Sequence, residues 1–252
     1  MGNDDLAGAV INRKGPVEYT DIDTLWKGYD DFVRELAQRE GVDRVAELGG
    51  GANPIIGDID KWGFATHRVV IDISAVELDK AQGDVELRVA DLCKPITEEL
   101  GTYDLLFSKM LCEHLPDART FHQNCFNLLR PGGLSVHYFP TLFTFPFVVN
   151  KLMPEKAARA LLDKIQPGRL QLGNMDKFPA HYRWTTGPTK RAIRRFESVG
   201  FEVEQWRGSY GHHYYHVIKP LDAIEQAKSR FLIKHPVPAL TSFAAIVLRK
   251  PA

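Results

Sequence analysis

The sequence has few of the features that mark secreted, membrane and nucleic-acid-binding proteins. Its 252 residues include only three cysteines, an odd number without metal-ligand spacing, which indicates reduced thiols rather than a disulfide framework. Lysine plus arginine equal aspartate plus glutamate at 32 each, so we expect no basic surface for nonspecific binding to nucleic acid. No apolar run reaches the roughly 18–20 residues that a membrane helix requires, so we expect no stable membrane insertion.

Targeting segments, internal repeats and low-complexity stretches are also missing. The first residues, MGNDDLAGAVINRKG, lack a signal-peptide pattern, and Leu6 stands where a myristoylation motif has Ser or Thr. The composition, 44% hydrophobic and 25% charged, fits a globular domain with a sizeable core. We therefore expect a single cytoplasmic domain over residues 1–252.

The most informative segment is VAELGGGANP, residues 45–54. A strand-like apolar run over residues 42–48 carries Glu47 near its end and then breaks into three glycines. Glycine lets the backbone turn tightly and approach a ligand, and a strand followed by such a turn makes a nucleotide site in open α/β sheets. A dinucleotide fingerprint is the competing interpretation, but it requires a small residue where Pro54 stands.

Acids end two further strand-like runs. HRVVIDI (residues 67–73) carries Asp72, which lies 21 residues after Gly51 (72 − 51), where a carboxylate can accept both hydroxyls of a ribose. VELRVADL (85–92) ends with Asp91 and Leu92. YDLLFS (103–108) is followed by KMLCEHLPD, and the turn signal LLRPGG precedes a fifth run, LSVHYFP.

These motifs, in this order, resemble those of class I S-adenosylmethionine (SAM) dependent methyltransferases over about residues 44–139. The resemblance implies a Rossmann-like α/β fold: a seven-stranded, mostly parallel sheet with an antiparallel last strand and helices on both faces. It implies SAM as the cofactor and S-adenosylhomocysteine as the product. In the family's pattern, Glu47 and the glycines hold the methionine end, Asp72 the ribose and Asp91 the adenine, and Ser108 and Lys109 border the transferred methyl. The implied cofactor-binding residues are Glu47, Gly49, Gly50, Gly51, Asp72, Ile73, Asp91, Leu92 and Ser108.

Three segments extend the core motifs. Residues 20–40 read as an amphipathic helix after a loose arm over residues 1–19. Such a helix packs on the sheet in the family, so Trp26 and Tyr29 are expected to pack there or to touch the cofactor. Residues 141–189 and 209–238 exceed a minimal domain and leave the carboxyl ends of parallel strands, so we expect them to form a lid over the acceptor pocket.

The two insertions combine rings with polar donors. TLFTFPFVVNKLMP (141–154) is apolar and suits a lid core, a homodimer interface or a wall for the acceptor. KFPAHYRWTT and GSYGHHYYHVIKP suit a carbohydrate, whose ring faces stack and whose rim carries hydroxyls, or a stacked phenol. They lack a carboxylate or cysteine at ligand spacing, so no metal is expected there. With the fifth strand, they supply the candidate acceptor-binding residues His137, Tyr138, His181, Tyr182, Arg183, Trp184, Tyr210, His212 and Tyr214.

His114, with Glu113 beside it, is the candidate catalytic base. A sugar hydroxyl is a weak nucleophile when neutral, and histidine is the usual base near neutral pH. The alternative is that this pair braces the following helix. His137 and Tyr138 are rival bases, although strand alternation lets at most one face the site. Some quinone-pathway relatives carry a metal-binding acid where Met110 stands, so a divalent metal is not favoured.

The tail motifs FPAHYRW and GFEVE narrow the expected acceptor. They resemble bacterial methyltransferases of saccharide and glycolipid pathways, and more narrowly the actinobacterial sugar O-methyltransferases of methylated-polysaccharide synthesis, mannoside 1-O-methyltransferases included. We therefore expect methyl transfer to a hydroxyl of a small saccharide. The alternatives are an O-methyltransferase for a phenol, quinol or other natural product, a SAM-binding module without catalysis and, more distantly, an NAD oxidoreductase.

Overall fold

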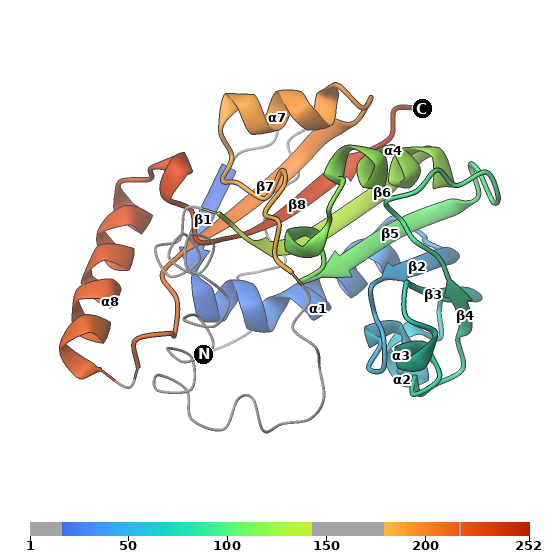
Figure 1. Cartoon of the computed structure of the whole chain (residues 1–252), viewed down its shortest axis with the longest axis horizontal. Coiled ribbons are helices and arrows are strands. Elements are labelled where there is room, and N and C mark those ends of the chain that lie inside the picture. The colour runs from blue at the N-terminus through green and yellow to red at the C-terminus, as the bar shows by residue number, and fades with distance from the viewer. Residues whose placement is uncertain (1–16, 143–178, 217) are drawn as a thin grey trace.

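The computed structural model describes residues 17–142, 179–216 and 218–252. Their strands form one eight-stranded sheet in the order β1-β7-β8-β6-β5-β2-β3-β4, in which only β8 runs antiparallel to the others (Figure 1). The predicted Rossmann-like class, with its antiparallel last strand, is confirmed. The strands are β1 (Val17–Asp21), β2 (Arg44–Leu48), β3 (His67–Asp72), β4 (Glu86–Val89), β5 (Tyr103–Lys109), β6 (Leu129–Pro140), β7 (Glu202–Tyr210) and β8 (Phe243–Arg249).

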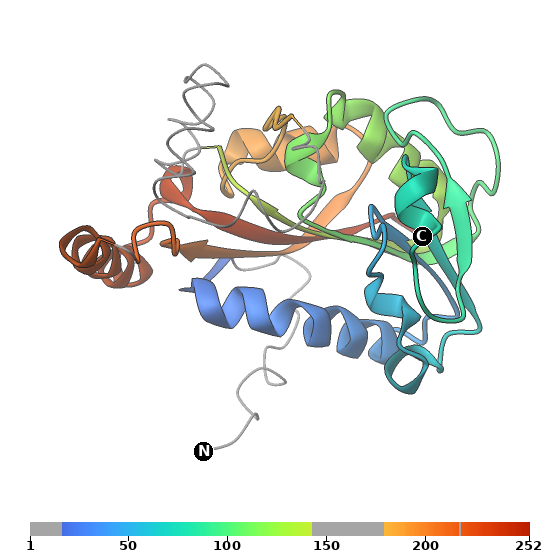
Figure 2. The same cartoon turned by 60° about the horizontal axis from the view of Figure 1, so that its bottom comes forward.

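Helices cover both faces of this sheet. Figure 2 shows α1 on one face and α4 and α7 on the other, while α8 stands beyond the carboxyl end of β7. The α-helices are α1 (Ile22–Arg39), α2 (Ile59–Trp62), α3 (Ala75–Leu78), α4 (Ala118–Leu128), α7 (Lys190–Glu197) and α8 (Lys219–Lys234). Short 3₁₀ turns lie at η2 (Ile55–Gly57), η3 (Cys112–His114) and η4 (Pro238–Leu240).

Helix α1 forms where its sequence predicts it. Asp21 caps it by accepting a hydrogen bond from the Thr24 backbone N–H at 2.9 Å. Leu25, Tyr29, Val33 and Leu36 recur at helical spacing and are buried against the sheet. The Tyr29 hydroxyl donates to the carbonyls of Ser108 and Val136, at 2.8 and 3.2 Å, which ties the helix to β5 and β6.

Strand β1 corrects the prediction of a loose arm over residues 1–19. Its residues 17–19 pair in parallel with β7, and the Tyr19 ring stacks on Tyr210 with centroids 4.9 Å apart. A five-residue edge strand carries little periodic signal of its own, and its partner lies far away in the chain. Residues 1–16 of the expected arm lie outside the described part of the chain.

The second expected insertion, residues 209–238, is largely helical. Strand β7 continues to Tyr210, and the segment after it contains α8 and η4. Of the first insertion, residues 143–178 lie outside the described residues, including most of the apolar stretch 141–154 and the first two residues of KFPAHYRWTT. A shared lid role for the two insertions, and a single domain over the whole chain, stay predictions.

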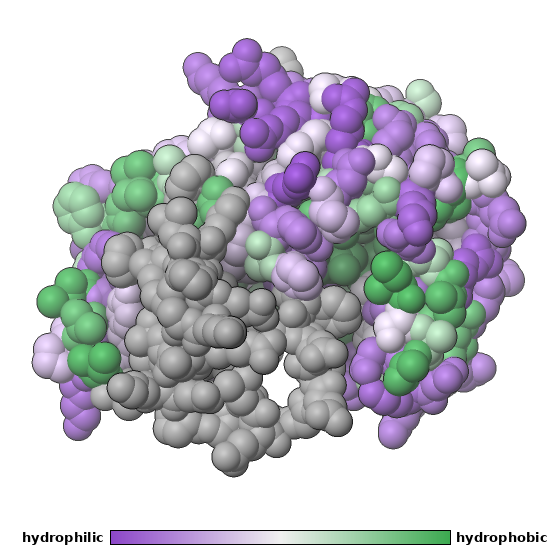
Figure 3. Space-filling view, viewed as in Figure 1, coloured by the Kyte–Doolittle hydropathy of each residue, from purple (hydrophilic) through white to green (hydrophobic). Residues whose placement is uncertain are grey.

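The described helices include none that combines the length and apolar character needed to cross a membrane. Exposed apolar side chains instead gather in two places (Figure 3). One group lies on α8 and comprises Leu221, Ile224 and Phe231. The other lies around the ends of β3 and β4 and comprises Ile73, Val76 and Val89.

Replacing Tyr29 with Phe tests the attachment of α1. The variant keeps the buried ring but removes the hydroxyl that bonds two strand carbonyls, so we expect the free energy of unfolding to fall by about 1–3 kcal/mol. Urea unfolding measures this change. Tyr215→Phe, at a partly exposed ring in the loop after β7, is the control and should shift it by less. Equal shifts in the two variants would contradict the proposed tie.

Candidate active site

The glycine loop surrounds a buried carboxyl at the end of β2. Glu47 is 4% exposed and accepts a hydrogen bond from the Ile56 backbone N–H at 3.1 Å. The Gly49 N–H donates to the Ile71 carbonyl at 2.7 Å, which holds the loop against the end of β3. Burial raises the Glu47 pKa to about 8, so a cationic group beside this carboxyl would favour its ionised form.

The loop needs glycine for two different reasons. Gly49 and Gly51 have φ of +72° and +49°, in the left-handed region where a side chain strains the backbone. A Cβ on Gly49 would lie 2.8 Å from Leu111 Cδ1, so a side chain there would also have to displace the end of Leu111. A Cβ on Gly51 would instead lie 3.6 Å from Asp72 Oδ2, between the glycine loop and this carboxylate.

Asp72 and Asp91 both lie where the sequence predicts, immediately at or after the ends of β3 and β4. Asp72 Oδ1 accepts from the Ser74 N–H at 2.9 Å, and its Oδ2 faces Gly51. Beside it, Ile73 is 59% exposed and offers an apolar surface on which a planar ring could pack. Asp91 Oδ1 accepts from the Cys93 N–H at 3.0 Å, and Leu92 is buried.

Lys109, at the end of β5, is held by α1. Its Nζ lies 2.7 Å from Asp30 Oδ1 and 4.6 Å from the centre of the Trp26 ring. Glu47 is close enough for Asp30 and Lys109 to affect its pKa, in opposite directions. No sequence pattern marks Asp30 as a site residue, because its role depends on how α1 docks on the sheet.

Strand alternation divides β5 and β6 between the two faces of the sheet. Leu105, Phe107, Val136 and Tyr138 belong to the core beside α1, whereas Leu106 and Phe139 belong to the core beside α4. Glu47, Lys109 and Tyr138 therefore lie on the α1 side of the sheet, and the site is built there.

Two predicted residues lie on the opposite side and are corrected. The Ser108 hydroxyl bonds to His137 Nδ1 at 2.8 Å in the core, so only the backbone of Ser108 can border a ligand at the strand end. His137 is fully buried, and its Nε2 bonds to the Ser135 hydroxyl at 2.7 Å. We no longer expect His137 to contact an acceptor or to serve as a base.

Glu113 and His114 lie in η3, next to the described end of the first insertion. The Glu113 carbonyl accepts from the N–H groups of His181 and Tyr182, at 2.7 and 3.0 Å. This backbone link brings His181 and Tyr182 of the predicted FPAHYRW motif to the catalytic candidates. The Glu113 side chain is 3% exposed, and its Oε2 has no hydrogen-bond partner among the described residues.

The contacts of His114 fix which nitrogen can act as a base. Its Nδ1 lies 3.2 Å from the Pro179 carbonyl, which only accepts hydrogen bonds, so Nδ1 carries a proton. In the neutral ring the electron pair is then on Nε2, which lies 3.6 Å from Glu113 Oε1. The imidazole is about one-third exposed.

Burial sets the charge state of the groups around this pair. It raises the Glu113 pKa to about 8, so much of this carboxyl is protonated at neutral pH. Burial and the nearby Glu113 charge raise the pKa of Tyr138 and Tyr182 above the usual tyrosine value. Tyr214, from the loop after β7, packs on the same core. The side chains around Glu113 are therefore largely aromatic and hydroxyl-bearing.

The remaining candidates are scattered. Trp184 packs on the α4 side, with its ring stacked on His122 at 5.6 Å, so it is corrected from acceptor-binding to core. Tyr182 and Trp184 have φ of +51° and +66°, so the chain turns between them and their rings go to different cores. Arg183 is exposed, and Tyr210 and His212 line a separate cavity near α8.

Comparison with known proteins identifies the domain type. Residues 46–137 match the family model described as "Methyltransferase domain". A ubiquinone biosynthesis O-methyltransferase from Cronobacter sakazakii is 32% identical over 102 residues, which make up 40% of this chain. The match spans only 35% of that protein, about a third of its length.

Solved structures show the same fold at low identity. A candidate sarcosine dimethylglycine methyltransferase from Galdieria sulphuraria is 16% identical, with a TM-score of 0.57 over 98% of this chain and 95% of that one. Phosphoethanolamine N-methyltransferase 2 from Haemonchus contortus, solved with SAM, is 14% identical, with a TM-score of 0.52 over 98% of this chain and 53% of that one.

Replacing Glu113 with Gln tests the burial of its carboxyl. An unfolded glutamate ionises near 4.5 and the folded Glu113 near 8, so the folded protein binds more protons between these values. The free energy of unfolding should therefore fall as the pH rises from about 4.5 to 8. Urea unfolding across this range should show a flatter fall in Glu113→Gln. The exposed Glu197→Gln should keep the wild-type slope, and an equally steep slope in Glu113→Gln would refute the assignment.

Proposed function

We propose that this chain, whose residues 46–137 match a methyltransferase domain, transfers a methyl group from SAM to a hydroxyl of a sugar or short oligosaccharide. The observation that carries the proposal is the arrangement around His114: a base with its electron pair fixed on Nε2, beside a buried carboxyl and rings that bear hydroxyls. A protein recognises a sugar by hydrogen bonds to the sugar's hydroxyls and by packing aromatic rings against the faces of the sugar ring.

The residues at the strand ends fit SAM. Asp72, facing the side-chain-free Gly51, suits a ribose, and the exposed Ile73 beside it suits an adenine. Glu47 and Asp30 suit the ammonium of the methionine end, and Lys109 its carboxylate. When bound, SAM would supply a methyl group from its positively charged sulfur. The rest of the molecule would leave as S-adenosylhomocysteine.

The protein's part in the reaction is to align the acceptor oxygen and remove its proton. Alignment of two reactants contributes about 7–11 kcal/mol in favourable cases. With SAM bound, His114 Nε2 would accept the hydroxyl proton as the acceptor oxygen takes the methyl group from sulfur, and Glu113 in its ionised form would stabilise the resulting imidazolium. Proton removal of this kind contributes about 10²–10⁴-fold in rate.

A phenol or quinol is the second candidate acceptor. It is favoured by the match to the ubiquinone biosynthesis O-methyltransferase and by Tyr138, Tyr182 and Tyr214, which could stack on an aromatic ring. No group of three or more His, Cys, Asp and Glu side chains in the described ranges is arranged to hold a metal ion.

The proposal extends to the protein's surroundings. We propose a small saccharide as its partner, no nucleic acid, and a cytoplasmic location, which the balanced charge and the three unpaired cysteines support. A homodimer stays a prediction that rests on the apolar stretch 141–154.

Transfer of a labelled methyl from SAM tests the acceptor class. The panel contains methyl mannoside, methyl glucoside, their short oligomers, and a set of phenols and quinols. Label on saccharides supports the proposal. Label on phenols or quinols alone refutes the sugar acceptor and keeps the transferase, whereas tight SAM binding without any transfer would favour the noncatalytic alternative.

Removing the His114 imidazole tests its role. In His114→Ala we expect kcat to fall by about 10²–10⁴-fold, with an unchanged SAM dissociation constant. Single-turnover transfer and calorimetric SAM binding measure the two quantities. His67→Ala, at an exposed histidine at the start of β3, should leave both unchanged. Full activity in His114→Ala would show that His114 is not the base and would favour the alternative that it braces the following helix.

Gly51→Ala tests the predicted ribose site, with Gly41→Ala as the matched control. Both glycines have positive φ, +49° and +64°, so both variants carry a similar backbone cost, but a Cβ on Gly41 meets no atom within 4 Å. We expect calorimetry to show SAM binding weakened about tenfold or more in Gly51→Ala alone, since about 1.4 kcal/mol of lost contact suffices. Equal affinities in the two variants would place the ribose elsewhere.

A further inference from the structure

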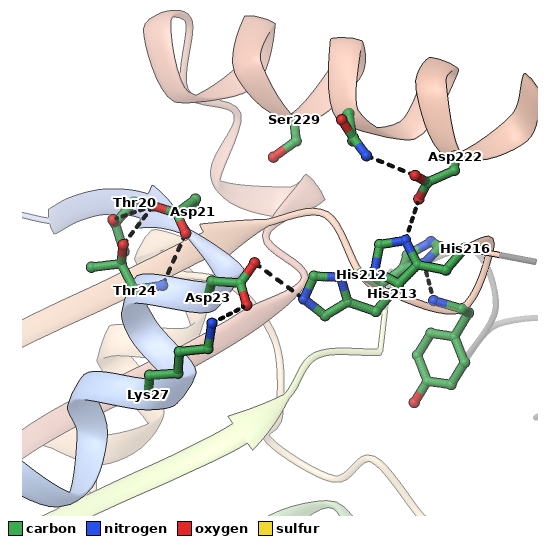
Figure 4. A network of polar contacts seen from close by, with 12 residues as sticks. Thr20, Asp21, Asp23, Thr24, Lys27, His212, His213, His216, Asp222 and Ser229 are labelled. Carbon is green, nitrogen blue, oxygen red and sulfur yellow. Dashed lines mark hydrogen bonds and ion pairs between the residues drawn. The ribbon is translucent and has the colours of Figure 1, made fainter. Parts of the chain in front are cut away.

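A cavity of about 660 Å³, lined by both apolar and polar side chains, lies apart from the residues assigned to methyl transfer. It is bounded by the start of α1, the end of β7 with the loop that follows it, and α8 (Figure 4). Its polar lining comes from these three elements and includes Asp21, Asp23, His212, His213, His216, Asp222, Glu225, Gln226, Ser229 and Arg230. Nothing in the proposed reaction at His114 uses these side chains.

Most of these side chains are already paired with one another. His213 Nε2 lies 3.4 Å from Asp23, which also pairs with Lys27, and His216 Nδ1 lies 3.0 Å from Asp222. The two imidazoles bond to each other at 2.5 Å, which connects α1 to α8 across the mouth of the cavity (Figure 4). These contacts hold the side chains of the cavity wall in fixed positions.

One pair in the wall is incomplete. His212 Nε2 and Glu225 Oε1 face each other at 3.6 Å, and neither atom has a hydrogen-bond partner in the described part of the chain. Both side chains are more than nine-tenths buried. The other oxygen of Glu225 is held by Lys228 Nζ at 2.6 Å, so Oε1 is the acceptor that is left. Leaving buried donors and acceptors unsatisfied is unfavourable, so both atoms are suited to bind a further polar group.

The hydrogen bonds define what this pair can bind. The Tyr214 backbone N–H donates to His212 Nδ1 at 3.3 Å, so the proton of the neutral ring is on Nε2. Burial lowers the His212 pKa to about 4, which keeps the ring neutral at physiological pH. The pair therefore presents one donor, Nε2–H, beside one acceptor, Oε1. A hydroxyl group donates and accepts at once, so it can bond to both atoms.

The same loop connects this cavity to the candidate active site. Residues 211–216 place His212, His213 and His216 against the cavity, while Tyr214 packs on the core that contains Tyr138 and Tyr182. Tyr214 and His212 are two residues apart, so the two sites share this loop.

We propose that the cavity between α1 and α8 is a second binding site for the acceptor, which takes a saccharide unit distant from the methylated hydroxyl, and that Glu225 and His212 share one of its hydroxyls. The proposal rests on the sugar acceptor proposed above and specifies it further: the acceptor is an oligosaccharide, and its length matters. The paired acids and histidines around the opening would bond the remaining hydroxyls.

Replacing Glu225 with Gln tests the shared hydroxyl, because a carboxylate bonds a hydroxyl more strongly than an amide does. We measure calorimetric binding of mannotetraose and methyl mannoside, together with methyl transfer to each. Wild type should bind the tetramer more tightly than the monomer. Glu225→Gln should weaken tetramer binding about tenfold, within the range expected for hydrogen bonds to charged groups, and leave the monomer unchanged. His212→Phe, which keeps a buried ring, should act in the same way.

Controls separate this proposal from a folding defect and from the proposed function. Glu197→Gln, on α7, should keep wild-type binding of both ligands, and SAM affinity should be unchanged in every variant. Equal tetramer binding in wild type and Glu225→Gln, or equal losses for tetramer and monomer, would overturn the second site while leaving methyl transfer intact. Tetramer binding that depends on Glu225 without transfer to any saccharide would show that the cavity binds saccharide, but it would overturn both the sugar acceptor and the cavity's role in binding it.

Discussion

The structure depends on one constraint, the common direction of β6, β5, β2, β3 and β4. Because these strands are parallel, their carboxyl ends meet at one edge, and every group that the chain places there becomes a neighbour. The backbone must turn sharply at this edge without closing it, and glycine allows this after β2. Glu47, Asp72 and Asp91 come from distant parts of the sequence and share an edge for this reason alone.

Alternation along the strands decides which residues join the site. On β5 and β6, Lys109 and Tyr138 face α1, whereas Ser108 and His137 face α4. The His137–Ser108 bond satisfies two polar groups inside an otherwise apolar core, and it removes both side chains from contact with a ligand. The sequence shows that neighbouring residues point to opposite faces, but it does not show which face carries the site.

Local patterns predicted the central sheet, α1 and the acids at the strand ends, because those features follow from hydrophobic periodicity, capping residues and glycine turns. They did not predict β1, whose pairing with β7 depends on a distant partner. They also missed Asp30, which is defined by helix docking, and misplaced Trp184, whose segment is turned by two left-handed residues. The sequence shows that the histidine- and tyrosine-rich tracts are polar and aromatic. It does not show that the loop of residues 211–216 places His212 at the cavity beside α8 and Tyr214 at the candidate active site.

The pairing of β1 with β7 has a consequence for synthesis on the ribosome. Val17 pairs with Trp206, which is made 189 residues later (206 − 17). Closing such a long loop costs entropy, and the partner strand does not exist until most of the chain has been translated. The parallel strands β2 to β6 can assemble first, with α1 docking on them through its buried face. The edge of the sheet that carries β1 is then completed among the last steps, so a nascent chain stalled before β7 would expose the unpaired edge of an otherwise formed domain.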